Sequence, residues 1–186
     1  MNPLIEELDT SSDTKAEKVI RRIVRRGKGP VPELLVAAKD RSRPRIRKWA
    51  LQALGELGDA RAKAVLVAAL KDERMTVRLH ALKGLGRLRI KATAKAVAKC
   101  VTDESGGVRV NALYALAKIG ERRIGPQVRK ALRDEQWYVR QAAAQLCGSL
   151  GLRSLRKELL SLVESDPRKA VRAAAKRSMD SLRSAR

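Results

Sequence analysis

The chain is poor in aromatic residues and histidine, and each shortage limits what it can be. Phenylalanine is absent from its 186 residues, and the only aromatic residues are Trp49, Tyr114, Trp137 and Tyr138. The core must therefore be built from alanine, leucine and valine, which favour closely packed helices with small contact residues. A single histidine, His80, cannot provide a metal centre that needs several imidazole ligands.

The chain also has few cysteines and no long apolar run. Cys100 and Cys147 fall at apolar core positions, so we expect both to be buried thiols. Two thiols make no disulfide framework, which favours a reducing compartment. Residues 1–12 are acidic and lack a basic segment, so no signal peptide is expected. Without 18 consecutive apolar residues, we expect no membrane span.

Positive charge is abundant. Lysine and arginine number 42 against 20 aspartates and glutamates, which gives a formal charge of +22. The excess is spread along the chain and is not confined to one basic tail. A chain this basic repels itself and attracts polyanions through steering and counterion release. This balance favours nucleic acid as the partner, with an acidic protein or anionic lipid headgroups as the alternatives.

An aspartate recurs along the chain every 31 or 32 residues, and an arginine preceded by an apolar residue follows it six or seven residues later. Self-similarity at one fixed period is typical of a stacked array, in which no repeat buries its apolar face alone. We expect each aspartate to cap a helix and to face the arginine of its own or a neighbouring repeat. This structural ladder consists of Asp40, Arg47, Asp72, Arg78, Asp103, Arg109, Asp134, Arg140, Asp166 and Arg172.

Each repeat reads as two amphipathic helices joined by short turns. In residues 72–102, Val77, Ala81 and Leu85 share one face of a helix over about 75–88, and a second helix follows over about 93–102. The predicted boundaries are an N-terminal tail at 1–12, capping helices at 13–39, a repeat array at 40–182 and a C-terminal tail at 183–186. We expect both tails to fray.

The repeats resemble the short HEAT-like repeats named for phycobilisome lyases. The shared signature is Asp, then Val-Arg, then Ala and Leu-Gly-x-Leu/Ile-Gly, clear over residues 46–58 and 77–86 and degraded at Met179-Asp180. The resemblance covers about residues 40–182. It implies an all-α, right-handed α-solenoid of about five two-helix repeats. It leaves the function open, because such solenoids serve as scaffolds, lyase subunits, metal hydroxylases and DNA glycosylases.

The resemblance also implies a binding face. In that family the helix with the Val-Arg pair lines a concave groove and displays the residues one, two, five and nine positions after the arginine. Lysine and arginine there would hold phosphates, and Trp49 and Tyr114 would stack on sugars or bases. The alternative is a solvated polar face. The candidate nucleic-acid-binding residues on this face are Lys48, Trp49, Gln52, His80, Lys83, Arg87, Asn111, Tyr114, Lys118 and Arg177.

The densest basic cluster lies before the repeat array. On a helix, Arg21, Arg22, Arg25 and Arg26 form one stripe opposite apolar residues that include Ile20. The stripe is either a solvated face or an anion-binding flank beside the groove. We include its four arginines among the candidate nucleic-acid-binding residues.

Three enzyme classes are known on this scaffold. A di-iron hydroxylase needs repeated His–Glu ligand pairs, which one histidine cannot supply. Nothing in the sequence is specific to a tetrapyrrole, as a bilin lyase would require. The binding mode is similar to that of HEAT-like alkylpurine DNA glycosylases, which use tryptophans and a catalytic aspartate in the groove. Here no aspartate lies on the predicted groove row, and Glu56 is the nearest acidic residue. We therefore expect no catalytic activity.

The sequence predicts a non-enzymatic HEAT-like repeat protein that contacts a nucleic-acid backbone through a basic concave groove, with little sequence specificity. DNA and RNA are not distinguished. The alternative is a protein-interaction scaffold that binds an acidic partner. We expect a monomer without cofactor, metal or membrane attachment, in the cytoplasm or associated with the nucleoid.

Overall fold

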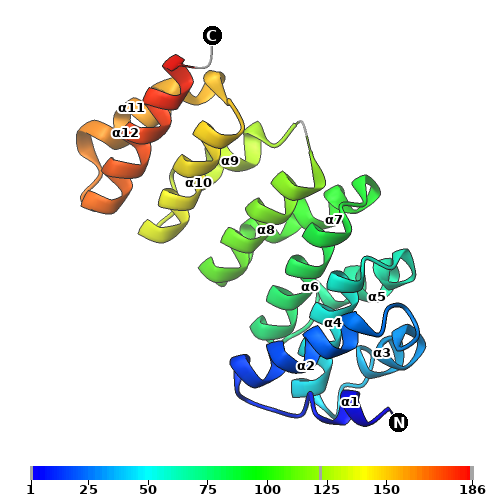
Figure 1. The fold of residues 1–186 in the computed structure, drawn as a ribbon. Helices are drawn as coiled ribbons and strands as arrows, with labels where there is room; N and C mark the ends of the chain where they lie inside the picture. The colour runs from blue at the N-terminus through cyan, green and yellow to red at the C-terminus, as the bar shows by residue number, and fades with distance from the viewer. Residues whose placement is uncertain (1, 122, 185–186) are drawn as a thin grey trace. The chain divides into compact units, whose positions relative to one another are not determined.

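The computed structural model describes residues 2–121 and 123–184, and every regular element within them is helical. The predicted all-α fold class is thus confirmed. Of the predicted C-terminal tail, residues 185 and 186 lie outside the described part, while 183 and 184 end the last helix. The α-helices are α1 (Pro3–Glu6), α2 (Asp13–Arg25), α3 (Val31–Ala37), α4 (Pro44–Leu57), α5 (Lys63–Ala69), α6 (Met75–Leu88), α7 (Ala94–Lys99), α8 (Gly106–Ile119), α9 (Gly125–Ala131), α10 (Trp137–Ser149), α11 (Arg156–Ser165) and α12 (Lys169–Ser184) (Figure 1).

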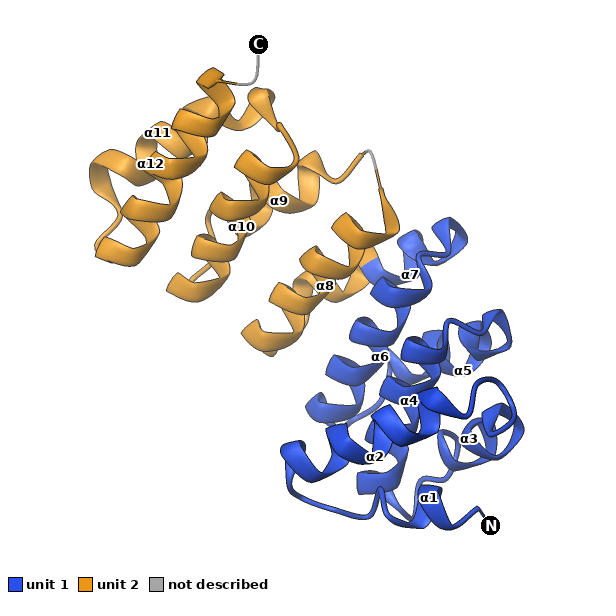
Figure 2. Cartoon of the chain, in the orientation of Figure 1, with its two compact units in different colours: residues 1–97 blue, residues 98–186 orange. Residues whose placement is uncertain are grey.

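Long and short helices alternate, and the chain divides into two compact units, unit 1 at residues 1–97 and unit 2 at residues 98–186 (Figure 2). In unit 1 the long helices α2, α4 and α6 pack in that order, and the short helices α3 and α5 lie against α4 and α6. In unit 2 the long helices α8, α10 and α12 pack side by side, with α9 against α10 and α11 against α12. Each unit therefore has one layer of long helices and one of short helices.

Small residues set the spacing of the long helices. A Cβ atom added at Gly55 in α4 would overlap the Cα atom of Gly84 in α6, so the two backbones touch. In unit 2, a Cβ atom at Gly148 in α10 would lie 2.9 Å from the Cα atom of Ser178 in α12. The Ser178 hydroxyl donates a hydrogen bond to the Ala144 carbonyl at 2.8 Å, so this buried hydroxyl has a partner within the close contact of the two helices.

The arginines of the ladder join successive turns. Arg109 donates from Nε and Nη2 to the two carboxylate oxygens of Asp134, both at 2.7 Å. Its Nη1 donates to the carbonyls of Asp103 and Glu104, in the turn that precedes its own helix. The arginine thus pairs with the aspartate of the next repeat and holds its own turn through the backbone. Within the units, the same pairing joins Arg47 to Asp72 and Arg140 to Asp166.

The N-terminal segment differs from the frayed tail that the sequence predicts. Residues 3–6 form α1, and the side chains of Leu4, Ile5 and Leu8 are buried. They cover the end of the unit 1 core, where the first long helix would otherwise expose apolar surface to water. The carbonyl of Thr10 accepts a hydrogen bond from the Trp49 side chain, so residues 2–10 are part of the packed unit.

The long helices α4, α6 and α8 each end at a residue with the left-handed backbone conformation. Gly58 caps α4 at φ 65°, and Gly120 caps α8 at φ 76°. Arg89 holds the same position after α6 with φ 52°, and it is the one non-glycine residue of positive φ in the described chain. A side chain in this region costs about 1–2 kcal/mol, so α6 ends with local strain.

Candidate interaction surface

The candidate site is the surface displayed by the long helices, taken separately in each unit. We call the first set of residues the long-helix face of unit 1 and the second the long-helix face of unit 2. The face of unit 1 consists of Lys48, Trp49, Gln52, Glu56, His80, Lys83 and Arg87, from α4 and α6. The face of unit 2 consists of Asn111, Tyr114, Lys118, Gln141, Gln145, Ser149 and Arg177, from α8, α10 and α12.

Trp49 lies in the interior of unit 1. Its side chain is 3% exposed, and its indole N–H donates to the Thr10 carbonyl at 3.1 Å. The ring meets His80 edge to face, with centroids 4.7 Å apart, and the Lys48 ammonium lies 4.3 Å from the ring centroid. Stacking on a base requires an open ring face, so we do not retain Trp49 as a ligand contact.

His80 is also buried, with 8% of its surface exposed. Burial, reinforced by Lys83 and Lys48, lowers its pKa from 6.5 to about 3, so the imidazole is neutral at physiological pH. Its Nδ1 atom is buried and has no hydrogen-bond partner among the described residues. His80 therefore belongs to the packing of α4 against α6 and cannot reach a ligand in solution.

Glu56 occupies two other polar side chains of the long-helix face of unit 1. Gln52 is buried and donates from Nε2 to the Glu56 carboxylate at 3.0 Å. Arg87 forms an ion pair with the same carboxylate. Lys48 and Lys83 are brought together around His80, and they are the two cations of this face that no carboxylate of the described chain neutralises. The face offers less free positive charge than the sequence suggests.

The long-helix face of unit 2 is mainly neutral and polar. The Tyr114 hydroxyl on α8 donates to the Gln145 side-chain oxygen on α10 at 3.2 Å, which links two neighbouring long helices. Asn111 donates to the carbonyl of Gly107 at 2.9 Å, one turn earlier. Lys118 and Arg177 are exposed. The face thus presents side-chain amides and one tyrosine between two cations.

The arginine cluster of the sequence lies on the outer side of α2. Arg21, Arg22, Arg25 and Arg26 are all exposed. Arg21 pairs with Glu17 at 3.5 Å within the helix, and Arg22 pairs with Glu7 at 2.5 Å. Both pairs are solvent-exposed, so each contributes at most about 1 kcal/mol.

Sequence reasoning missed one exposed aromatic group. Trp137 and Tyr138 begin α10, are 38% and 37% exposed, and meet at 86° with centroids 5.8 Å apart. Tyr138 packs over Gly106 at the start of α8, where an added Cβ atom would overlap the Tyr138 hydroxyl. The pair could have been found by aligning the repeats. Trp137 and Tyr138 stand at the positions that Gly106 and Gly107 occupy in the preceding repeat, and these glycines leave space for a large neighbouring side chain.

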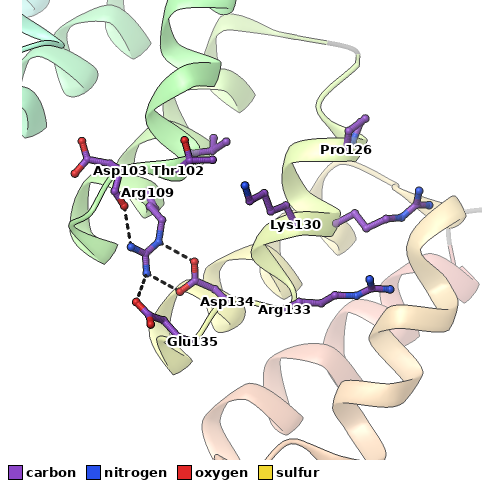
Figure 3. Close-up of a pocket in the computed structure, with 10 residues that line it drawn as sticks. Thr102, Asp103, Arg109, Pro126, Lys130, Arg133, Asp134 and Glu135 are labelled. Atoms are coloured by element: carbon purple, nitrogen blue, oxygen red, sulfur yellow. Dashed lines mark hydrogen bonds and ion pairs between the residues drawn. The ribbon is translucent and has the colours of Figure 1, made fainter.

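A hollow of unit 2 lies where the ladder meets α9 (Figure 3). It has a volume of about 640 Å³ and is lined by residues that include Thr102, Pro126 and Lys130. Arg109 borders it, but its guanidinium is already bound to Asp134, Glu135 and the Asp103 carbonyl, as the dashed lines in Figure 3 show. The hollow therefore borders the structural ladder.

Three further observations limit the chemistry of the described chain. Cys100 and Cys147 are buried, and burial, helped by Glu158, raises the pKa of the Cys147 thiol to about 12. Within residues 2–121 and 123–184, no three His, Cys, Asp or Glu side chains gather into a group that could hold a metal ion. None of the described helices is long and apolar enough to cross a membrane.

Comparisons with known proteins agree with this architecture. A family model described as HEAT repeats matches residues 1–77, 65–133 and 125–186. A search of curated proteins found no match. One similar solved structure is the complex of CpcE and CpcF of phycocyanin lyase from Nostoc sp. PCC7120. It is 22% identical with a TM-score of 0.65, over 92% of this chain and 73% of that chain.

Designed repeat proteins share the fold as well. A designed armadillo repeat protein in complex with the peptide (KR)4 is 16% identical with a TM-score of 0.61, over 96% of this chain and 98% of that chain. An engineered protein is 16% identical with a TM-score of 0.62, over 99% and 100%. At these identities the likeness concerns the fold, and it confirms the predicted α-solenoid of HEAT-like repeats.

Proposed function

Because this chain belongs to the HEAT-repeat family, we propose that it is a non-enzymatic interaction scaffold that holds an extended acidic segment of a partner protein on the long-helix face of unit 2. The observation that carries the proposal is the composition of that face. It combines the amides of Asn111, Gln141 and Gln145 with Tyr114 and two exposed cations.

Amide side chains match a peptide backbone better than a phosphate backbone. An amide offers both N–H donors and a carbonyl acceptor, and a peptide backbone presents the complementary pair at every residue. A phosphodiester presents only acceptors, which would leave the acceptor oxygen of Gln141 unused, whereas the Gln145 oxygen already accepts from Tyr114. We propose that these glutamines bind the main chain of the partner segment, as side-chain amides can bind an extended strand.

The positive charge of the face favours acidic side chains in the partner segment. Lys118 and Arg177 are exposed at the two outer long helices of the face, where each can pair with a carboxylate. The net charge of +22 repels basic segments and accelerates the approach of acidic ones. Packed helices lie about 8–10 Å apart, and an extended chain advances about 3.3 Å per residue, so roughly six residues span the three helices.

The nucleic-acid alternative for the long-helix faces of the two units has weaker support. It needs a row of free cations with open aromatic rings, but Trp49 is buried and Arg87 is paired with Glu56. In unit 2 the row contributes Lys118 and Arg177 as its cations. The DNA duplex in the test below distinguishes this alternative.

The test is binding of a fluorescein-labelled acidic peptide, with a lysine-containing peptide of the same length and a short DNA duplex as competitors. We expect Gln145→Ala and Lys118→Ala each to weaken peptide binding by about fivefold, roughly 1 kcal/mol per side chain. Gln136→Ala and Lys157→Ala, at exposed positions off this face, are the matched controls. Equal weakening of peptide binding in the control variants would refute the assignment. So would competition that depends only on the net charge of the competitor.

A further inference from the structure

A second surface, on α2 of unit 1, has a different chemistry. Its outer face consists of Lys15, Lys18, Arg21, Arg22, Arg25 and Arg26. We infer that this outer face of α2 binds the phosphate backbone of a nucleic acid. The inference concerns another unit and another set of residues than the proposed protein-binding face, and it does not rest on that proposal.

The two sides of α2 are sharply separated. At 100° per residue, Ala16, Val19, Ile20 and Ile23 fall on one side, and all four are buried. The six cations fall on the other side, and all six are exposed. Because α2 packs against α4 through the buried side, the cations are presented by a helix that is held in place.

Little of this charge is neutralised within the protein. Arg21 and Arg22 pair with Glu17 and Glu7, but both pairs are exposed to solvent. Such pairs are weak, so a phosphate can replace the carboxylate at small cost. Across residues 2–121 and 123–184, no carboxylate forms an ion pair with Lys15, Lys18, Arg25 or Arg26.

The spacing of the cations fits a regular row of phosphates. Residues three or four apart on a helix lie about 5–6 Å from each other, so Lys18, Arg22 and Arg26 form one row and Arg21 and Arg25 another. A duplex carries one negative charge per about 1.7 Å of its axis, roughly twice the density of an extended acidic chain at about 3.3 Å per residue. Four of the six cations are arginines, whose planar guanidinium can bind a phosphate through two parallel hydrogen bonds.

The same face lacks what a membrane surface requires. Stable attachment to a bilayer needs an apolar side chain or a lipid anchor in addition to basic residues. The apolar residues of α2 are buried, apart from Val24, which is half-buried. An acidic protein could pair with single arginines, but it would leave most of the two rows unused.

The experiment compares two variants that remove the same number of charges from unit 1. In the first, Arg21, Arg22, Arg25 and Arg26 are changed to Gln, which preserves helix propensity. In the second, Lys63, Lys71, Lys91 and Lys95, exposed at other sites of unit 1, are changed to Gln. Anisotropy with a labelled duplex is measured between about 50 and 200 mM salt, and circular dichroism verifies that both variants are folded.

We expect the α2 variant to bind the duplex at least tenfold more weakly. The slope of log K against log salt should also become shallower, by about 0.9 for each phosphate that the variant no longer neutralises. The control variant should retain most of the affinity and slope of the wild type. Equal weakening in both variants would show a response to net charge alone and would overturn the assignment. So would α2-dependent binding to anionic vesicles without α2-dependent binding to the duplex.

Discussion

The indole N–H of Trp49 donates a hydrogen bond to the Thr10 carbonyl at 3.1 Å, and it joins α4 to a segment 39 residues earlier in the chain. The bond is buried, and the same ring packs against His80. This one side chain therefore connects the N-terminal segment with both α4 and α6. The stability of unit 1 should depend on it.

Trp49→Phe removes the donor and part of the ring while preserving an aromatic side chain. The Thr10 carbonyl loses its partner and a small cavity remains, so we expect a loss of about 2–4 kcal/mol in the free energy of unfolding. Urea denaturation followed by circular dichroism measures it. Trp137→Phe is the matched control, because Trp137 is 38% exposed and should change stability by about 0.5 kcal/mol or less. Similar losses in the two variants would contradict the interior role of Trp49.

Protonation of His80 should destabilise the protein in mild acid. The folded pKa is lowered to about 3 from 6.5, so between these values the unfolded chain binds a proton that the folded chain does not. Stability therefore falls as the pH decreases below about 6.5, by up to about 1.4 kcal/mol per pH unit. Urea midpoints at pH 7 and pH 5 test this.

The variant His80→Leu separates this effect from carboxylate titration. It removes the imidazole and should reduce the loss between pH 7 and pH 5 by about 2 kcal/mol, which corresponds to about 1.5 pH units of linkage. If the variant and the wild type lose the same stability over this interval, His80 is not the titrating group.

Loss of a buried ladder carboxylate should cost far more than loss of a surface one. Asp134→Ala leaves the guanidinium of Arg109, whose side chain is 9% exposed, without its bidentate partner. We expect a loss of about 3–5 kcal/mol. Glu7→Ala is the comparison, because the side chains of Glu7 and its partner Arg22 are 40% and 52% exposed and the pair should contribute about 1 kcal/mol or less. Thermal and urea unfolding of both variants measure the difference, and comparable losses would argue against the ladder as a structural element.

Arg89 occupies a backbone conformation that suits glycine, with φ at 52°. Arg89→Gly should therefore stabilise the protein by about 0.5–1 kcal/mol, through relief of strain at the end of α6. Lys83→Gly, in the middle of the same helix and also exposed, should have the opposite sign and cost about 1 kcal/mol. Thermal unfolding distinguishes the two, and destabilisation by Arg89→Gly would show that the side chain contributes more than the strain costs.

The sequence predicts the fold well, because the repeats impose the same local pattern several times. The helix over 75–88 agrees with α6 at both ends, since its apolar spacing is helical and Arg89 interrupts the phase. The alternation of long and short helices follows from the same period. The N-terminal segment was missed, because Leu4, Ile5 and Leu8 lie outside any repeat and their burial depends on a distant core.

The candidate site is less readable from sequence, for a physical reason. The helical spacing of Trp49 and His80 predicts that their side chains lie on the exposed face. This spacing contains no information about other segments that cover them, and both side chains are buried. Trp49 is covered by Thr10, and His80 is packed against Trp49 itself. Tyr138 illustrates the converse, since its position depends on the absence of a side chain at Gly106, one repeat earlier.

The backbone contact between Gly55 and Gly84 gives unit 1 a point where geometry can be changed without altering any displayed residue. A single methyl group at position 55 would act as a wedge and force α4 and α6 apart. Because the residues of the long-helix face are fixed to these helices, the wedge would change their separation while leaving their chemistry intact. The spacing between the exposed side chains of α4 and α6 is thus fixed by the absence of a side chain at two buried positions.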